Sequence, residues 1–176
     1  MQEIINLNGE KYIFKKLSID NEIQVFDLLS QCDDYFYLVE GRKADESSVK
    51  ELFEDLPPGK HIDDKNIFGV FYNEKLIGIV DLVQDFPEKG EWIIGLMLLH
   101  PDERRKGLGK AIHDIIVDIA NEQKAKKLRI GVVEQNEKAL KYWKNIGYKE
   151  IKRTQPLKYG SKESIVIVMN YFLNAI

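Results

Sequence analysis

EWIIGLMLLHPDERRKGLGKA, residues 91–111, holds the features that decide the fold: an almost unbroken apolar run, then two glycines among basic side chains. The apolar run, Glu91–His100, predicts a central strand, because a strand covered on both faces of its sheet is apolar at nearly every position. Gly95 interrupts the run and indicates a β-bulge or a close approach of another backbone. The stretch therefore predicts a buried strand that leads into a glycine-containing turn.

A helix and a second strand follow this turn. After Gly107 the apolar residues return at steps of three and four as far as about Lys124, which is helical spacing. Lys127–Val133 is then a short β-rich run. A strand, a helix and a strand in this order form a right-handed crossover between parallel strands. The sequence thus predicts an α/β fold built around this unit.

The remaining segments add antiparallel strands and further helices. Two β-rich runs around residues 73–75 predict a hairpin, whereas residues 33–44 show neither helical nor strand spacing and are predicted to form a loop. The other expected strands are Lys11–Leu17, Ile67–Tyr72, Leu76–Val83, Tyr148–Thr154 and Glu163–Phe172, and the other helices run from Asp20 to near Cys32, from Asp45 to Leu56 and from Asn136 to Asn145. We expect a mixed, mostly antiparallel sheet of about seven strands, flanked by about four helices.

Composition narrows the class of protein. The chain has 176 residues, of which 44% are hydrophobic, and a formal net charge of −3. This size suits one domain over residues 1–176, and this charge does not suit a nucleic-acid binder. The single Cys32 leaves no internal disulfide and is interpreted as a packing residue in a reducing compartment. His61, His100 and His113 have no metal-ligand spacing, so no metal is expected.

Targeting signals are also missing from the sequence. The first residues lack a basic start followed by an apolar run, so no signal peptide is visible. No stretch approaches the roughly 18 to 20 apolar residues of a membrane span. We therefore expect a cytoplasmic protein with no nucleic-acid or membrane partner.

The basic glycine turn is suited to bind phosphate. N–H groups in the first turn of a helix lack intrahelical acceptors, and the helix dipole adds positive charge there. Glycines let a ligand approach the backbone closely and permit positive φ. The residues that supply these features are Arg104, Arg105, Lys106, Gly107, Gly109 and Lys110. Taken alone, the pattern is equally compatible with a solvated basic turn.

Two familiar phosphate motifs do not fit this turn. A Walker loop needs a glycine five residues before Gly109 and a Ser or Thr after Lys110, and both are missing. A Rossmann fingerprint needs a third glycine at the position of Ile112. Neither a Walker nor a Rossmann site is therefore predicted, and a solvated basic turn stays open.

Two motifs point to one family. Arg104 to Gly109 fits [RQ]-x-x-G-x-[GA], and NEKALKYWKNIGY, residues 136–148, fits N-x-x-A-x-x-[FY]-[YW]-x-x-x-G-[FY]. Together they resemble the GNAT superfamily of acetyl-CoA-dependent N-acetyltransferases. The motif resemblance is strong over residues 91–151, and the order of elements extends it along the chain. The first 60 residues carry only the expected helix pair, in a region that varies with substrate in this family.

The resemblance implies a binding site for acetyl-CoA. In the family, the strand before the phosphate loop splays from its neighbour, and its free backbone groups pair with the pantetheine amides. The positions that match the family's cofactor contacts are Met97, Leu98, Leu99, Arg104, the backbone amides of Arg105, Lys106, Gly107, Leu108, Gly109 and Lys110, and then Asn136, Ala139 and Trp143. A backbone N–H in the strand, at Leu98 or a neighbour, would also polarise the thioester carbonyl.

The resemblance also implies direct attack of an amine on the thioester, and this requires a base to remove the ammonium proton. Glu91 is the first candidate and Asp81, embedded in an apolar strand, is the second. The family's glutamate after the helix corresponds to Gly131 here, so that base is missing. The tyrosine that protonates the leaving thiolate in many members is replaced by Trp143, which leaves either an unprotonated thiolate or another tyrosine such as Tyr148 or Tyr159.

The acceptor is expected to be a primary amine, either a small molecule or a peptide. Acidic and aromatic residues between the first helices suit a cationic amine. The candidate substrate residues are Asp34, Tyr35 and Tyr37, together with Glu91. Polyamines, aminoglycosides, amino acids and protein N-termini all stay open, and so does the oligomeric state, including a homodimer. The alternative function is a catalytically weak acyl-CoA-binding sensor or interaction module.

Overall fold

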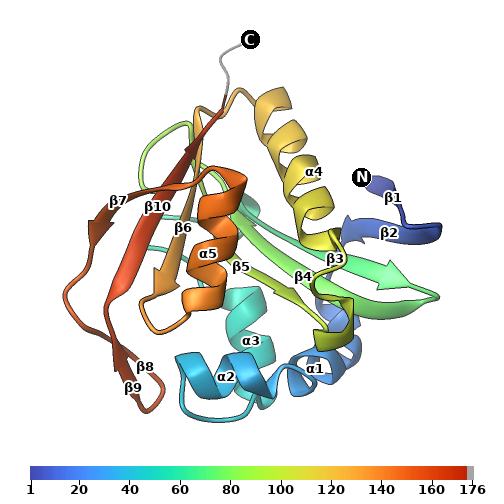
Figure 1. The fold of residues 1–176 in the computed structure, drawn as a ribbon, viewed down its shortest axis with the longest axis horizontal. Helices are drawn as coiled ribbons and strands as arrows, with labels where there is room; N and C mark the ends of the chain where they lie inside the picture. Colours follow the sequence, from blue (N-terminus) through green and yellow to red (C-terminus); the bar gives the residue numbers. More distant parts are fainter. Residues whose placement is uncertain (174–176) are drawn as a thin grey trace.

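The computed structural model describes residues 1–173 and contains a mixed sheet with the strand order β1-β2-β3-β4-β5-β6-β10-β7 (Figure 1). Its strands are β1 (Gln2–Leu7), β2 (Glu10–Lys16), β3 (Lys65–Tyr72), β4 (Lys75–Val83), β5 (Glu91–Leu99), β6 (Lys127–Val133), β7 (Lys149–Arg153) and β10 (Val166–Phe172). Among these described strands, only β5 and β6 pair in parallel. A separate hairpin joins β8 (Leu157–Tyr159) to β9 (Lys162–Ser164).

Helices cover both faces of the sheet. They are α1 (Glu22–Ser30), α2 (Asp33–Val39), α3 (Glu46–Glu54), α4 (Leu108–Glu122) and α5 (Glu137–Ile146). Residues of α4 and α5 pack in one hydrophobic cluster, and residues of α1, α2 and α3 pack in another. Side chains along β5 alternate between the two clusters, so the sheet separates them. The molecule therefore has an α4–α5 side and an α1–α3 side.

The sequence-based prediction of an α/β fold with a mixed sheet is confirmed. β5, α4 and β6 form the expected parallel crossover, and β3 and β4 form the expected hairpin. The bulge expected at Gly95 is present, because β4 pairs Asp81 with Leu96 but Leu82 with Ile94, which leaves Gly95 without a partner. The end of α5 is also as expected, since Gly147 adopts a left-handed φ of 119°.

Four elements were not predicted as separate elements, namely α2, β1, β8 and β9, and β9 overlaps the start of the strand predicted over Glu163–Phe172. Residues 33–39 form α2 rather than a loop, because two acidic residues in its first turn favour a helix start that the short apolar pattern does not reveal. β1 is an edge strand with a single buried side chain, Ile5, so it shows no clear alternation of apolar residues. The β8–β9 hairpin is too short for a periodic signal.

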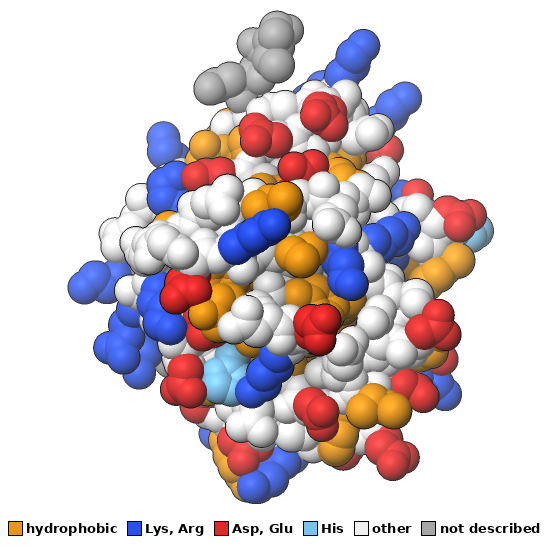
Figure 2. Space-filling view, turned by 90° about the vertical axis from the view of Figure 1, so that its right-hand side faces the viewer, with side chains coloured by type: hydrophobic (Ala, Val, Ile, Leu, Met, Phe, Trp, Pro, Cys, Tyr) orange, Lys and Arg blue, Asp and Glu red, His pale blue; other side chains and the backbone are white. Residues whose placement is uncertain are grey.

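The surface charge is mixed. Figure 2 looks onto the side of the molecule that carries β1 and β2 and shows Lys and Arg side chains interspersed with Asp and Glu. Across residues 1–173, no helix is long and apolar enough to cross a membrane.

Candidate active site

The sheet splits between β5 and β6. The two strands pair only from Glu91 to Ile94 on β5, whereas β5 continues to pair with β4 as far as Leu99. The last part of β5 therefore has an open edge on the side where β6 has left it. Unpaired backbone groups on such an edge are available to a ligand.

The hydrogen-bond pattern shows which residues of β5 face this open edge. The N–H of His100 donates to the carbonyl of Ile77 at 2.8 Å. Bonded and non-bonded pairs alternate along an antiparallel ladder, so the backbone of Leu98 is bonded to β4, while those of Met97 and Leu99 point to the open edge. The expectation that the N–H of Leu98 meets the cofactor is therefore not supported. Met97 and Leu99 retain the expected orientation.

The turn before α4 presents a row of backbone donors. Arg105 and Gly107 have left-handed φ angles of 63° and 91°, which turn successive N–H groups outward. Within the described part of the chain, the N–H groups of residues 105–110 have no hydrogen-bond acceptor. A Cβ on Gly107 would have no atom nearer than 3.8 Å, so the space beside this glycine is open. These features fit a bound phosphate.

The cations of this turn are largely engaged by acids. Lys106 Nζ lies 3.3 Å from Glu103, and Lys110 Nζ lies 2.7 Å from Asp114. These ion pairs are exposed and weak, but they show that the anion site is built mainly from backbone N–H groups rather than from free side-chain charge.

Arg104 ties the turn to α2. Its Nε donates to the carbonyl of Leu99 at 2.9 Å, and its guanidinium binds both carboxylate oxygens of Asp34. The hydrogen bond from Arg104 holds the pKa of Asp34 below its usual value. Arg104 therefore orients the loop, and Asp34 is occupied by Arg104 rather than facing a substrate cavity as the sequence had suggested.

Gly109 allows α4 and α5 to approach each other closely. A Cβ at this position would lie 2.8 Å from the hydroxyl oxygen of Tyr142. That hydroxyl is buried and has no hydrogen-bond partner among residues 1–173. A glycine at this position of the motif therefore lets α4 and α5 pack without displacing the Tyr142 side chain.

Trp143 is a packing residue in this structure. Its side chain is buried against His113 and Tyr148, with ring centroids 6.1 and 4.9 Å away. The Tyr148 hydroxyl lies 3.1 Å from Nε2 of His113, whose pKa burial lowers to about 4. This geometry does not support Trp143 or Tyr148 as groups that touch a thioester. Tyr159 packs instead beside Val39 in a third cluster.

Asn136 caps α5. Its side-chain oxygen accepts a hydrogen bond from the N–H of Ala139 at 3.1 Å, as the capping interpretation predicts. The cap uses only the oxygen of the Asn136 amide. Ala139 packs partly buried against the cluster on the α4–α5 side.

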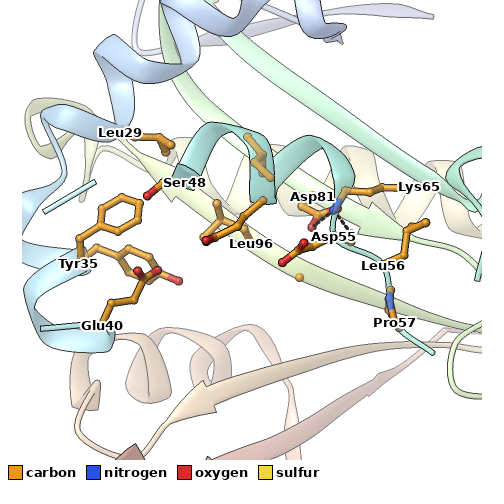
Figure 3. A pocket seen from close by; sticks show the side chains of 14 residues that line it. Leu29, Tyr35, Glu40, Ser48, Asp55, Leu56, Pro57, Lys65, Asp81 and Leu96 are labelled. Carbon is orange, nitrogen blue, oxygen red and sulfur yellow. Dashed lines mark hydrogen bonds and ion pairs between the residues drawn. The ribbon is translucent and has the colours of Figure 1, made fainter. Parts of the chain in front are cut away.

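A cavity of about 530 Å³ lies on the α1–α3 side of β5. Figure 3 shows Tyr35 and Glu40 at one end, Lys65 and Asp81 at the other, and Leu96 of β5 between them. The carboxylates of its lining are Glu40, Glu51, Asp55 and Asp81, whereas Lys65 is its only cation among the described residues. The cavity therefore meets β5 at the split, from the face opposite to α4, and its lining is acidic, although Arg42 lies 2.8 Å from Glu40 and 3.7 Å from Glu51.

Asp81 is held at the deep end of the cavity. Its Oδ2 accepts a hydrogen bond from Lys65 Nζ at 3.0 Å, and a Cβ on Gly95 would lie 2.8 Å from this oxygen. Burial raises the pKa of Asp81, and the charge of Lys65 opposes this effect. Oδ1 is buried and has no partner among the residues that the structure describes. An unpartnered buried carboxylate oxygen calls for a ligand, a water or a catalytic role.

Glu91 is far from this arrangement. It lies at the start of β5, and its buried carboxylate is ion-paired with Lys127 at 2.9 Å and with Arg129 at 3.0 Å. Both cations belong to β6, so the ion pairs tie this carboxylate to the paired part of the two strands. Glu91 Oε1, like Asp81 Oδ1, has no hydrogen-bond partner among the described residues, so its position rather than its bonding separates it from Asp81. Glu91 also does not line the cavity. The structure does not support Glu91 as the base or as a substrate contact.

Of the two tyrosines predicted to contact the substrate, only one lines the cavity. Tyr35 lines the cavity, as expected, while Tyr37 points to solvent with 49% of its surface exposed. Cys32 is fully buried, and burial raises the pKa of its thiol to about 11, in agreement with a packing role. Among residues 1–173, no group of three or more His, Cys, Asp or Glu side chains could hold a metal ion.

Lys65 is the residue that the sequence interpretation missed. It is 16 residues from Asp81 in the chain, and the hairpin register pairs Asp81 with Ile67. Residues two apart on a strand share a face, so Lys65 lies diagonally across from Asp81. Extending the predicted hairpin by two residues reveals this pair.

Comparison with known proteins agrees with this geometry. A sequence profile described as the acetyltransferase (GNAT) family matches residues 24–148. The chain belongs to the GNAT acetyltransferase family. The match spans most of the chain, from α1 to the end of the α5 motif, and it makes this GNAT protein an acyltransferase. No curated protein matches it by sequence similarity.

Solved structures share the GNAT fold at low sequence identity. An acetyltransferase from Thermus thermophilus is 17% identical, with 92% of this chain and 97% of that chain covered and a TM-score of 0.74. The ribosomal-protein-S18-alanine N-acetyltransferase from Escherichia coli is 14% identical, with coverage of 94% and 96% and a TM-score of 0.68. A spermidine N-acetyltransferase from Vibrio cholerae, solved with CoA and spermine, is 16% identical, with coverage of 92% and 95% and a TM-score of 0.70.

Proposed function

We propose that this GNAT protein transfers an acetyl group from acetyl-CoA to a primary amine, with the two substrates meeting at β5 from opposite faces of the sheet. The observation that carries the proposal is the open edge of β5 after Ile94, which lies between a turn of unbonded N–H groups and an acidic cavity. The proposal gives each of these three features one task.

The donor side binds through the backbone. The N–H groups of residues 105–110 hold the pyrophosphate, since they lack other acceptors in the described structure and lie at the start of α4. The Met97 carbonyl and the Leu99 N–H pair with the pantetheine amides, since the Leu99 carbonyl already accepts a hydrogen bond from Arg104. The side-chain N–H of Asn136 is left over from its capping role and adds a further donor, while the small Ala139 leaves room beside it.

When bound, acetyl-CoA supplies a thioester whose acetyl carbon is open to attack by an amine. The N–H of Met97 faces the open edge and stabilises negative charge that develops on the acetyl oxygen. A fixed donor of this kind is worth about 3 kcal/mol in other enzymes. The backbone N–H that polarises the thioester carbonyl is therefore assigned to Met97 instead of Leu98.

The acceptor side supplies the base. An amine that enters as an ammonium ion must lose a proton before it can attack. Asp81 is paired by the register with Leu96, next to Met97, and its Oδ1 has no other partner in the described residues. Asp81 therefore takes the proton directly or through one water.

No protein acid is assigned to the leaving sulfur. Trp143 and Tyr148 are both buried in the aromatic cluster between α4, α5 and β10, and an indole N–H does not act as an acid. A thiol has a pKa of about 8.5, so departure as a thiolate needs no acid from these positions.

The acidic cavity favours a cationic amine as the acceptor. Its described lining holds four carboxylates and one lysine, and Arg42 outside the lining pairs with Glu40 and Glu51, at 2.8 and 3.7 Å, so a net negative charge remains. Tyr35 adds an aromatic ring to the lining, which suits a cation. Small cationic amines, such as the spermine present in the Vibrio cholerae structure, are suitable first probes.

Thiol release from acetyl-CoA tests this function. Wild type and Asp81→Asn would be assayed with spermidine, kanamycin, L-lysine and a peptide with a free N-terminal alanine. We expect amine-dependent release in the wild type and a fall in kcat/KM of at least about a hundredfold in Asp81→Asn, with unchanged affinity for acetyl-CoA. Tight binding of acetyl-CoA without amine-dependent release in this panel would contradict the proposal and favour the acyl-CoA-binding module.

A further inference from the structure

Lys65 is a buried cation with two fixed acceptors. Its side chain is only 3% exposed, and Nζ donates to Asp81 Oδ2 at 3.0 Å and to the backbone carbonyl of Asp55 at 2.7 Å. A buried ammonium group is tolerated only with such partners. The two bonds join β3 to β4 and to the residue that ends α3.

The same carboxylate is confined by β5. Gly95 is the bulged residue of that strand, and any side chain there would meet Asp81 Oδ2. Lys65 from one side and the bulge from the other therefore fix one oxygen of Asp81. Oδ1 is then the oxygen that remains for a substrate.

We propose that Lys65 is a positioning residue for acetyl transfer, which fixes Oδ2 of Asp81 and so orients the other carboxylate oxygen toward the acceptor amine. The catalytic part of this inference rests on the proposed function. The effect of Lys65 on Asp81 does not, because it can be measured with no substrate present.

The charges around Asp81 determine the sign of the expected change. Lys65 comes from β3, and Asp55 follows α3. Glu51 of α3, Tyr35 of α2 and Glu40, which follows α2, line the same cavity. β5 contributes only Gly95 and Leu96 to this lining, among the residues that the structure describes. Burial and Asp55 raise the pKa of Asp81, and Lys65 lowers it. Loss of the lysine charge leaves the raising influences unopposed, so the carboxyl group becomes protonated at a higher pH.

The first test is a titration of Asp81 in the substrate-free protein. Carboxyl ¹³C NMR, with the Asp81 signal assigned by its loss in Asp81→Asn, would be recorded for wild type, Lys65→Gln and Lys65→Arg. We expect the pKa of Asp81 to rise by about one unit or more in Lys65→Gln and to stay near the wild-type value in Lys65→Arg. Lys65→Gln retains a donor for the Asp55 carbonyl, and Lys65→Met is the second neutral variant if it does not fold.

The second test follows the pH profile of kcat/KM for the amine that gives the fastest thiol release. A base must be deprotonated to act, so its acidic limb should move to higher pH in Lys65→Gln by the shift seen in the titration. Lys65→Arg should restore the wild-type limb, and the affinity for acetyl-CoA should be the same in all three proteins. An unchanged Asp81 pKa in both neutral variants would overturn the inference. A loss of activity with no shift of the limb would also overturn it, since it would leave Lys65 only a structural role.

Discussion

The two sides of β5 recognise their ligands by different means. On the α4–α5 side, the candidate cofactor site consists mainly of backbone groups, namely the N–H groups of residues 105–110 and the open edge at Met97 and Leu99. On the α1–α3 side, the candidate acceptor site consists of side chains from α2, α3, β3 and β4 around one cavity. A site made of backbone groups needs glycines and a helix start at a fixed spacing in the sequence. A site made of side chains needs only that residues far apart in the sequence lie close together in the fold. The proposed function accordingly assigns acetyl-CoA to the backbone site and the amine to the side-chain site.

The largest expected effect is on the backbone side. Gly107→Val places a branched side chain at a φ of 91°, in the open space beside the turn, and should abolish measurable binding of acetyl-CoA in calorimetry. Gly59→Val is the matched control, since Gly59 also has a left-handed φ, of 77°, and open space around it. Both variants carry backbone strain of about 1–3 kcal/mol. Equal binding of acetyl-CoA by the two variants would contradict the backbone cradle.

Glu91→Gln distinguishes between Glu91 and Asp81, the two acids that the sequence predicts as candidate bases. It removes the shared partner of two cations at a buried site, so urea unfolding should show a loss of roughly 3 kcal/mol in stability. The kcat/KM of the folded enzyme should remain within about twofold of wild type, in contrast to Asp81→Asn. A large fall in kcat/KM at unchanged stability would return Glu91 to the role of base.

Gly95→Ala tests the close approach of the β5 backbone to the Asp81 carboxylate. The added Cβ would lie 2.8 Å from Asp81 Oδ2, so the carboxylate must leave the position in which Lys65 and the bulge hold it, and kcat/KM should fall about tenfold. Gly131→Ala is the control, because its Cβ would meet a Val166 methyl group at 2.9 Å and so creates similar crowding far from Asp81. A similar fall in both variants would assign the effect to strain in the sheet.

The smallest expected effect is a gain of stability. Tyr142→Phe removes a buried hydroxyl that has no partner in the described structure and should raise the free energy of unfolding by up to about 1 kcal/mol. It also relieves the contact that a Cβ at position 109 would make. Gly109→Ala should therefore be less destabilising in the Tyr142→Phe background. Equal costs in the two backgrounds would show that the Gly109 contact is not with this hydroxyl.

Sequence alone predicts most of the backbone side, because its features are local. The bulge at Gly95, the glycine turn, the Asn136 cap and the end of α5 at Gly147 each follow from residue types at short spacing. The orientation of Leu98 could not be predicted, because the bulge shifts the phase of the hydrogen bonds by one residue.

The acceptor side was predicted less well for the same physical reason. Asp81 drew attention as an acid within an apolar strand, but its partner Lys65 comes from another strand. Glu91 looked similar in sequence, and only the register with β6 shows that Lys127 and Arg129 neutralise it. α2 was taken for a loop, so Asp34 and Tyr37 could not be assigned to the helix faces that point away from the cavity.

Arg104 connects the two sides of β5. Its side chain donates hydrogen bonds to the carbonyl of Leu99, at the end of β5, and to Asp34, in the first turn of α2. Tyr35, the residue after Asp34, lines the cavity. Within the proposed function, a movement of the phosphate-binding turn would reach the cavity wall through Arg104 and Asp34. We therefore expect acetyl-CoA to bind before the amine, because its nucleotide end would set the shape of the acceptor cavity.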